Sequence, residues 1–445
     1  MRFAEPASSP AHDRVRTRHQ QLTGLSPTHV AVGPAPTTLA GHCTDVYGGM
    51  TITALTEPGV AVAASARTDG VISVREFQSD GTEVTHGTTE LSHLDSIHAP
   101  VGSAGAPFES AHRRSPHPLD SLPHHVARAT HLGGLIWSMI HRQMLSRDTQ
   151  GMDITVEMDV LPTSGAGYVE AIDAALSVAL HCDAAGDGLS DAPIRARLAD
   201  ICWQSARHFG TSPVSRSRIV AALRGSAEGL TVIDFADGAV TSAPTLIGGP
   251  LELLELASTP TAAAGACADT VSTALLRAQH EFAEQAAQAF GVETVRLLPD
   301  AHHRVVDWLE AVCESRGPDG IPSPSHAHAW MSYWEAQTRL SAQAASALRS
   351  LDHTRALPMI TSASRACAQL YGARDEGLTR ACRDAGAVAA WLTCRPAEGT
   401  VLALVPGGQV DDYVRQLDRE NPGMFAQVRR LHPAGPARCV QHSSH

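Results

Sequence analysis

Residues 159–180 read DVLPTSGAGYVEAIDAALSVAL, and this stretch decides the fold expected of the chain. The alternating apolar residues just before it, in 154–161 (ITVEMDVL), predict a strand, and the alanine- and leucine-rich run after Gly167 predicts a helix. Gly165 and Gly167 can adopt backbone angles closed to other residues, so amide N–H groups can converge on an anion at the positive end of the helix. The stretch therefore indicates a phosphate-binding turn, with an ordinary strand-to-helix connection as the alternative.

The first turn of that helix departs from an ordinary phosphate site. Glu170 has a carboxylate that suits the helix dipole but would repel a phosphate at close range. Its neighbours Val169 and Ala171 supply no hydroxyl group. The turn has the shape of a nucleotide site from which part of the chemistry has been removed.

Composition narrows the class of protein. With 445 residues, 43% of them apolar, the chain is long enough for two or three packed lobes of a soluble globular protein. All 34 basic residues are arginine, because the sequence contains no lysine. A Walker lysine, a Schiff base to pyridoxal phosphate and a protein-kinase lysine are thereby excluded. The formal charge of −12 predicts no attraction to nucleic acid or to anionic membranes.

Cysteine and histidine usage points to neither a disulfide framework nor a metal site. The nine cysteines are scattered and lack CxxC spacing, so we expect reduced core residues in a cytoplasmic protein. No signal peptide or membrane-spanning run is evident. Histidine is plentiful, at 24 residues, but the pairs at 124–125, 302–303 and 326/328 lie far apart and lack paired carboxylates, so no metal site is expected.

The remaining elements are read from periodicity and from turn residues. We expect a short helix over 15–22, a strand from residue 29 kept extended by two prolines, and long helices over 264–290 and 329–348. Three short strands, MTITAL, VAVAASA and VISVREF, follow the Gly48-Gly49 turn and predict a mixed or antiparallel sheet.

Several segments resemble one family in the same order. GPAPTTLAGHCTDVYGG (33–49) is similar to the galactokinase signature, APGRVNLIGEHTDYNGG, and LPTSGAGYVEAIDAAL (161–176) falls where that family has PxGAGLSSSAAL. ATHLGGLIWSM (129–139), GLTVIDFADG (229–238) and GAVAAWLTCRPAEGTVLALVP (386–406) extend the resemblance over nearly the whole chain.

Galactokinases belong to the GHMP small-molecule kinases, and the resemblance implies their fold. We expect a two-lobed α+β GHMP-kinase fold, with an N-terminal lobe like domain 2 of ribosomal protein S5 and an α/β C-terminal lobe. A polar leader would cover residues 1–28, the N-terminal lobe 29–205 and the C-terminal lobe 206–445. The resemblance also implies a small-molecule sugar as substrate, with ATP and Mg²⁺ as cofactors.

The resemblance transfers binding roles to particular residues. Sugar contacts would come from His42, Thr44, Asp45 and Gly48, and nucleotide contacts from Ser164, Gly165, Ala166, Gly167, Tyr168 and Glu170. Asp45 is the best remaining sugar contact, because a carboxylate can accept from two neighbouring hydroxyls, and a turn-stabilising role is its alternative.

The catalytic groups of the family are not matched. The signature arginine is Pro36, which cannot donate a hydrogen bond to a developing phosphoryl charge. The base segment falls on Ser217-Arg218, and the nearest acidic residues in sequence are Asp200 and Glu228. The glycine-rich GGGFGG becomes CRPAEG at 394–399. The sequence therefore predicts that no catalytic residue is retained, unless Glu170 ligates Mg²⁺ as carboxylates often do.

Three functions follow. The first is a divergent galactokinase-like protein with a degraded active site that binds a sugar or nucleotide without efficient phosphoryl transfer, or acts as a sensor with a protein partner. The second is a working ATP-dependent galactokinase or related sugar-1-kinase. The third is a structural paralogue that binds no small molecule.

Overall fold

The computed structural model describes most of the chain, including the elements around the predicted site. The described residues are 1–4, 9–98, 119, 122–160, 167–185, 191–211, 213–259, 267–317, 322–371, 377–393 and 400–440.

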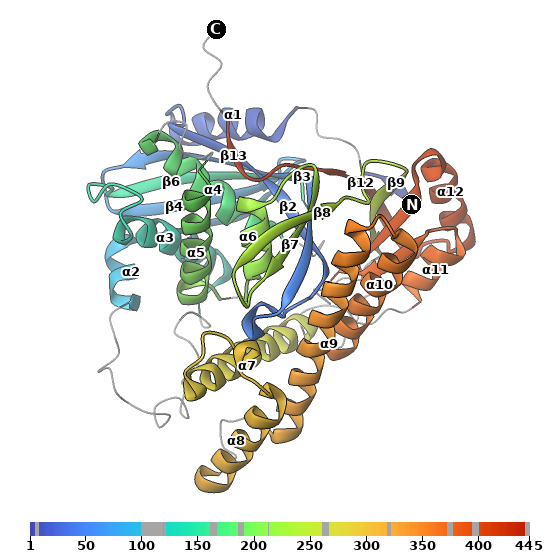
Figure 1. Cartoon of the computed structure of the whole chain (residues 1–445). Helices are drawn as coiled ribbons and strands as arrows, with labels where there is room; N and C mark the ends of the chain where they lie inside the picture. The colour runs from blue at the N-terminus through green and yellow to red at the C-terminus, as the bar shows by residue number, and fades with distance from the viewer. Residues whose placement is uncertain are drawn as a thin grey trace.

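One long strand, β3 (Met50–Arg67), organises the sheet. It pairs antiparallel with β2 (His29–Ala40), β6 (Gly151–Met158), β7 (Gly229–Asp234) and β12 (Phe425–Pro433). Within the described ranges, thirteen strands join one sheet whose main path runs β10-β11-β9-β12-β3-β6-β4-β5 (Figure 1). The pairs β4·β6 and β1·β12 are parallel and the others antiparallel, so the sheet is mixed, one of the two arrangements predicted. The other strands are β1 (Arg2–Phe3), β4 (Val71–Gln78), β5 (Glu83–Glu90), β8 (Ala239–Pro244), β9 (Leu251–Ser258), β10 (Ala389–Leu392), β11 (Thr400–Pro406) and β13 (Arg438–Cys439).

The expectation of separate strands at MTITAL and VAVAASA is wrong, because both belong to β3. The intervening Glu57-Pro58-Gly59 carries a turn signal. However, β2 pairs with both halves, as Ala35 lies opposite Thr56 and Gly33 opposite Val60. A single neighbouring strand therefore holds the two halves in line, and the local turn preference is overridden.

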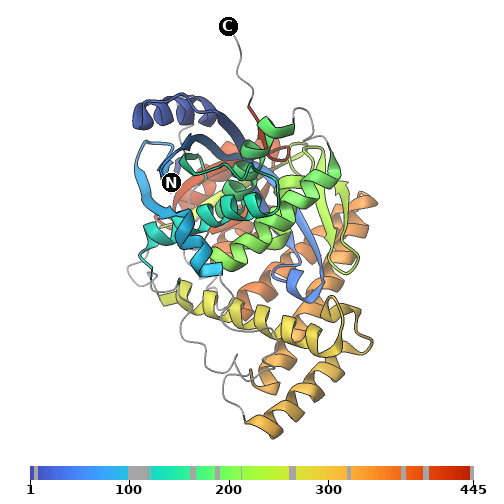
Figure 2. The ribbon, with the colours of Figure 1, turned by 90° about the vertical axis from the view of Figure 1, so that its left-hand side faces the viewer.

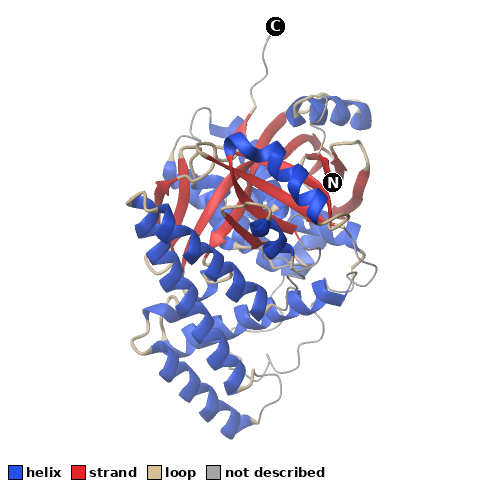
Figure 3. Cartoon of the chain, turned by 90° about the vertical axis from the view of Figure 1, so that its right-hand side faces the viewer, coloured by secondary structure: helices blue, strands red, loops and turns tan. Residues whose placement is uncertain are grey.

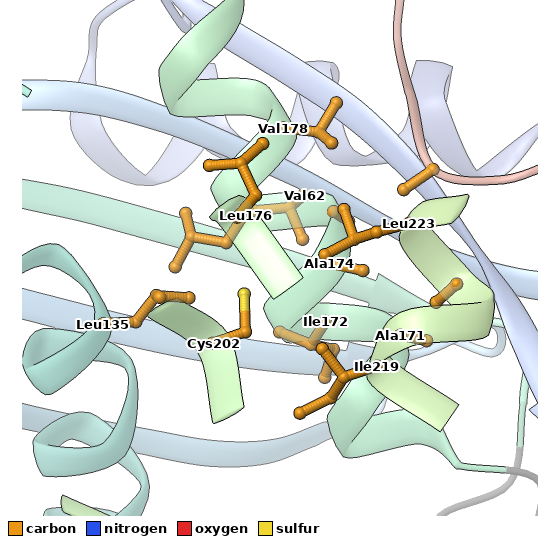
Figure 4. Close-up of a cluster of buried hydrophobic side chains, with 14 of the residues drawn as sticks. Val62, Leu135, Ala171, Ile172, Ala174, Leu176, Val178, Cys202, Ile219 and Leu223 are labelled. Carbon is orange, nitrogen blue, oxygen red and sulfur yellow. The ribbon is translucent and has the colours of Figure 1, made fainter. Parts of the chain in front are cut away.

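Helices cover both faces of the sheet near its centre. Val15 of α1 (Ala11–Thr23) packs with Ala61 and Ala63 of β3 on one face. Helix α4 (Tyr168–Ala185) packs against Val62 on the other, because successive strand residues point to opposite sides. Figure 4 shows Ile172 and Leu176 of α4 in this core, with side chains from α3, α5 and α6 around them. These helices are α3 (His124–His141), α5 (Ala192–Phe209) and α6 (Arg216–Arg224).

A group of helices extends away from the sheet. Figure 2 shows α7 and α8 at the end of the molecule opposite α1, and Figure 3 shows helices at this end. Helix α9 runs from there back to the sheet, where Ala344 and Leu348 pack with Ile52 of β3. The 3-10 turn η1 (Asp45–Tyr47) packs against this group, since the Tyr47 ring stacks on Trp334 of α9 with centroids 5.7 Å apart. The remaining helices are α2 (Leu91–His98), α7 (Cys267–Phe290), α8 (Ala301–Arg316), α9 (Pro324–Arg349), α10 (His353–Leu370), α11 (Leu378–Asp384) and α12 (Val410–Glu420), with 3-10 turns η5 (Val295–Leu297) and η6 (Gly407–Gln409). The predicted helices over 15–22, 264–290 and 329–348 correspond to α1, α7 and α9.

The expectation of uniformly reduced cysteines is wrong. Cys182, in α4, forms a disulfide with Cys439, in β13. The two are 257 residues apart. The antiparallel pairing of β13 with β2 and the packing of α4 on these strands bring them together, so spacing could not reveal the pair.

None of the helices in the described part combines the length and apolar character needed to cross a bilayer. Among the described residues, no group of three or more His, Cys, Asp or Glu side chains is arranged to hold a metal ion.

Candidate functional site

The start of α4 lies against β2 and α6. Gly167, just before the helix, has a φ of +66°, and a Cβ there would lie 2.7 Å from the Pro36 carbonyl oxygen and 3.0 Å from Arg218 Cδ. Only glycine satisfies both the backbone angle and this close approach. Of the predicted nucleotide contacts, Gly167, Tyr168 and Glu170 are described, whereas Ser164, Gly165 and Ala166 lie outside the described residues. The segment 394–399 also lies outside them.

Two buried carboxylates hold the first residues of α6. The Ser215 N–H donates to Glu170 Oε1 at 2.9 Å, and the Arg216 N–H donates to Asp45 Oδ2 at 2.7 Å. Glu170 is 1% exposed and Asp45 5% exposed. Ser215 is the N-cap residue, and its own side chain makes no capping bond. The carboxylates therefore satisfy N–H groups that a helix start leaves open, and their charge complements the positive end of the helix.

These groups border one cavity of about 50 Å³. Arg218 enters it from α6, and its Nε donates to Thr38 Oγ1 at 3.4 Å. Asp45 and Glu170 thus face the segment where the sequence offers no carboxylate for the family's base. Asp45 is 171 residues from its hydrogen-bond partner at the start of α6, and Glu170 is 45 residues from its own. The cavity is lined by Thr38, His42, Cys43, Asp45, Glu170, Pro213, Val214, Ser215, Arg218, Leu276 and His280.

His42 is the most deeply buried imidazole at the cavity. Its side chain is enclosed at 2% exposure, and neither ring nitrogen has a hydrogen-bond partner of good geometry. Burial, and then the positive charge of Arg218, lower the pKa of His42 to about 3, against a smaller opposing effect of the Leu39 backbone. The ring is therefore neutral at ordinary pH, with one N–H donor and one acceptor nitrogen.

Four predicted residues that the structure describes do not line the cavity: Gly167, Thr44, Gly48 and Tyr168. Thr44 Oγ1 donates to the Gly41 carbonyl at 2.9 Å and so stabilises its own turn. Gly48 has a φ of +89° and packs against Thr294, so it shapes the loop. Tyr168 lies with its ring 6.0 Å from the Arg128 guanidinium. Of the predicted contacts that the structure describes, His42, Asp45 and Glu170 line the cavity.

Two chemically important lining residues were missed. Arg218 was noted only because it stands where the family has a carboxylate, and His280 of α7 was not predicted to take part. Burial lowers the pKa of His280, while Asp45 raises it and Arg207 lowers it further. Leu276 and His280 are four residues apart and thus share one helix face, but nothing in the sequence indicated that this face meets η1.

The fold can be compared with those of known proteins. No protein-family model matches the sequence, and no curated protein matches it. Solved structures do match: L. major mevalonate kinase in complex with R-mevalonate has a TM-score of 0.51 at 15% identity, covering 92% of this chain and 99% of that one. Homoserine kinase from Cytophaga hutchinsonii has a TM-score of 0.50 at 10% identity, covering 93% and 97%. The chain has the mixed α+β fold of the GHMP kinases, as predicted.

Within that class, the structure is also similar to Lactococcus lactis galactokinase complexed with galactose. The TM-score is 0.65 at 12% identity, and the match covers 96% of this chain and 99% of that one. At this identity the likeness shows the fold.

Proposed function

We propose that the chain is a divergent, galactokinase-like protein that binds a sugar in the cavity between η1, α4, α6 and α7, without efficient phosphoryl transfer. The observation that carries this proposal is the meeting of buried Asp45, Glu170, Arg218 and neutral His42 around one cavity. Carboxylates accept hydrogen bonds, a guanidinium donates them, and a neutral imidazole does both. Such a set suits a ligand that presents several hydroxyl groups.

The inference of weak transfer rests on how the charged groups are used. Asp45 and Glu170 each have one oxygen engaged by the backbone of α6, which ties them to the fold. Pro36 packs against Gly167 and has no N–H or charge to stabilise a transferred phosphoryl group. Groups that position and neutralise the phosphoryl group supply most of the catalysis in such enzymes.

ATP and Mg²⁺ serve the GHMP kinases, and part of this site fits them chemically. Glu170 offers the hard oxygen ligand that Mg²⁺ prefers, and Gly167 stands at the positive end of α4. Bound there, Mg²⁺ would neutralise phosphate charge.

A second candidate is an ATP-dependent sugar-1-kinase with relocated groups. It is favoured by one observation: Arg218, on the element where the family places its base, lines the same cavity as Glu170 and Asp45. A guanidinium and a carboxylate are the two kinds of group that phosphoryl transfer needs. Here the guanidinium lies on the helix where the family has its catalytic carboxylate, and the carboxylates lie on η1 and α4.

Calorimetric titration with galactose, in the presence and absence of Mg-ATP, tests the proposal. We expect millimolar or tighter binding of the sugar, lost in Asp45→Asn and kept in Asp148→Asn, an exposed aspartate in a loop. A coupled assay of ADP release decides between the candidates, because sugar-dependent turnover abolished by Glu170→Gln would favour the kinase. If neither sugar nor nucleotide binds, the protein is best described as a structural paralogue that binds no small molecule.

A further inference from the structure

Histidines from two pairs that are separate in the sequence meet between α8 and α9. His302 is the second residue of α8, and His328 lies in the first turns of α9. Their rings face each other, with His302 Nε2 2.8 Å from His328 Nδ1 and the ring centroids 4.5 Å apart. The fold thus removes the separation that argued against a metal site in the sequence.

A carboxylate holds the His302 ring from its other side. His302 Nδ1 donates to Glu335 Oε2 at 3.3 Å. Glu335 comes seven residues after His328, which places it two turns further along the same face of α9. Because an ionised carboxylate only accepts hydrogen bonds, the proton of neutral His302 lies on Nδ1, and the lone pair on Nε2 points at His328.

This arrangement has the features of histidines that bind metal ions. A metal-ligating imidazole usually donates its second ring N–H to a carboxylate, which fixes the ring and makes the coordinating nitrogen more basic. Two nitrogens that bind one ion at about 2.0–2.1 Å lie about 3 Å apart, and the nitrogens of His302 and His328 are 2.8 Å apart. A modest rotation of the exposed His328 ring brings both lone pairs onto one point. The proton that His328 Nδ1 now donates then moves, through solvent, to its own Nε2.

We propose that His302 and His328 bind one divalent transition-metal ion that prefers imidazole nitrogen, namely Zn²⁺, Ni²⁺ or Cu²⁺, with water as the remaining ligands. Glu335 acts through His302 and stays off the metal, because it is engaged by the opposite ring nitrogen. Two protein ligands are sufficient for such a site, which agrees with the absence of a metal-binding group of three or more residues from the described ranges. Mg²⁺ prefers oxygen ligands and should not bind here.

The neighbouring histidines are not expected to take part. His303 follows His302 directly, and successive helix residues do not share a face; its ring centroid lies 6.0 Å from that of His302. The His326 ring stacks on Trp330 at 6.1 Å. His303 therefore offers a matched control, being an exposed histidine next to the site.

Calorimetric titration of the full chain with Zn²⁺ in a non-chelating buffer at pH 7 tests the site. We expect one equivalent of Zn²⁺ to bind the wild type, to bind at least about tenfold more weakly in His302→Ala and in His328→Ala, and to bind unchanged in His303→Ala. Glu335→Ala should weaken binding about tenfold, the usual effect of losing the outer partner of a ligating histidine. Comparison between folded variants, checked by circular dichroism, cancels Zn²⁺ binding by thiols and by other histidines.

Several results would overturn the proposal. Equal Zn²⁺ affinity in the wild type and His302→Ala would do so, as would a loss in His303→Ala as large as that in His302→Ala. Saturable binding of Mg²⁺ that competes with Zn²⁺ would show that the site is not one for imidazole-preferring ions.

Anomalous diffraction from a crystal soaked in Zn²⁺ locates the ion directly. We expect a peak about 2.0–2.1 Å from both His302 Nε2 and His328 Nδ1. No peak between these two rings, or an ion that is coordinated by Glu335 in place of His328, contradicts the assigned ligands.

Discussion

Removing the negative partner of the buried Glu76–Arg128 pair should destabilise the protein strongly. Arg128 Nε of α3 donates to Glu76 Oε1 of β4 at 2.6 Å, and the side chains are 8% and 2% exposed. Glu76→Gln keeps an acceptor of the same shape but leaves the guanidinium without its nearest counter-charge. Breaking a buried pair in this way costs about 3–5 kcal/mol.

A second carboxylate near Arg128 places the expected loss of stability in Glu76→Gln at the lower end of that range. The carboxylate of Asp173 also stabilises the Arg128 charge, but it is engaged by His131 Nε2 at 2.8 Å. We expect the free energy of unfolding to fall by about 3 kcal/mol. The double replacement Glu76→Leu with Arg128→Met should recover most of the loss, because apolar residues of similar volume can replace a buried ion pair at little cost.

Urea unfolding followed by tryptophan fluorescence measures these changes, with the denaturant dependence compared between variants. The matched control is Glu83→Gln, which breaks the Arg75–Glu83 pair on the same hairpin, where the side chains are 29% and 35% exposed. Exposed pairs contribute about 0–1 kcal/mol, so the control should change little. A loss below about 1 kcal/mol in Glu76→Gln, equal to that of the control, would refute the reasoning.

Three further predictions concern the core and the site. The pKa of His42 is about 3 in the folded protein and about 6.5 in the unfolded protein. Between pH 6.5 and pH 3 the unfolded state therefore binds one more proton than the folded state, so the free energy of unfolding falls as the pH falls. From pH 6.5 to 5 the loss should be about 2 kcal/mol, measured by urea unfolding, and a folded His42→Asn variant that loses just as much contradicts this assignment. In Gly134→Ala, the new Cβ would lie 2.3 Å from Phe209 Cγ. This clash should outweigh the gain in helix propensity of about 1 kcal/mol and lower the melting temperature. Adding Phe209→Leu should restore part of the melting temperature. Gly167→Ala combines a positive φ with contacts at 2.7 Å and should weaken nucleotide or sugar binding in calorimetry; unchanged affinity would show that the start of α4 is remote from the ligand.

Sequence patterns predicted those parts of the fold that depend on local periodicity. The strand and helix flanking the glycines, now β6 and α4, follow from period-2 and helical spacing. The same reasoning divided β3 into two strands, because a local turn signal at Glu57-Pro58-Gly59 carries no information about β2 beside it. Pairing between distant strands decided that point.

The sequence identified several residues of the site, but it could not show that they lie close together. Asp45 and Glu170 stood out because their residue types matched or departed from a family motif. Their common attachment to α6 depends on contacts across 171 and 45 residues. Arg218 could have been recognised from sequence as a charge introduced at the expected base position. His280 could not, because an isolated histidine in an alanine-rich helix carries no signal of what lies opposite.

The pairing of β13 with β2 has a consequence for how the protein is made. Ala437 N–H donates to the Ala222 carbonyl of α6 at 2.7 Å, and β12 pairs with β3, so strands late in the sequence complete a sheet that contains much earlier strands. A nascent chain leaves Ala31 and Val32 of β2, and Thr56 and Glu57 of β3, without these strand partners until residues near 440 leave the ribosome, and unpaired edges invite aggregation. We therefore expect folding of the nascent chain to depend on chaperones, because the sheet is completed by strands that lie far along the sequence.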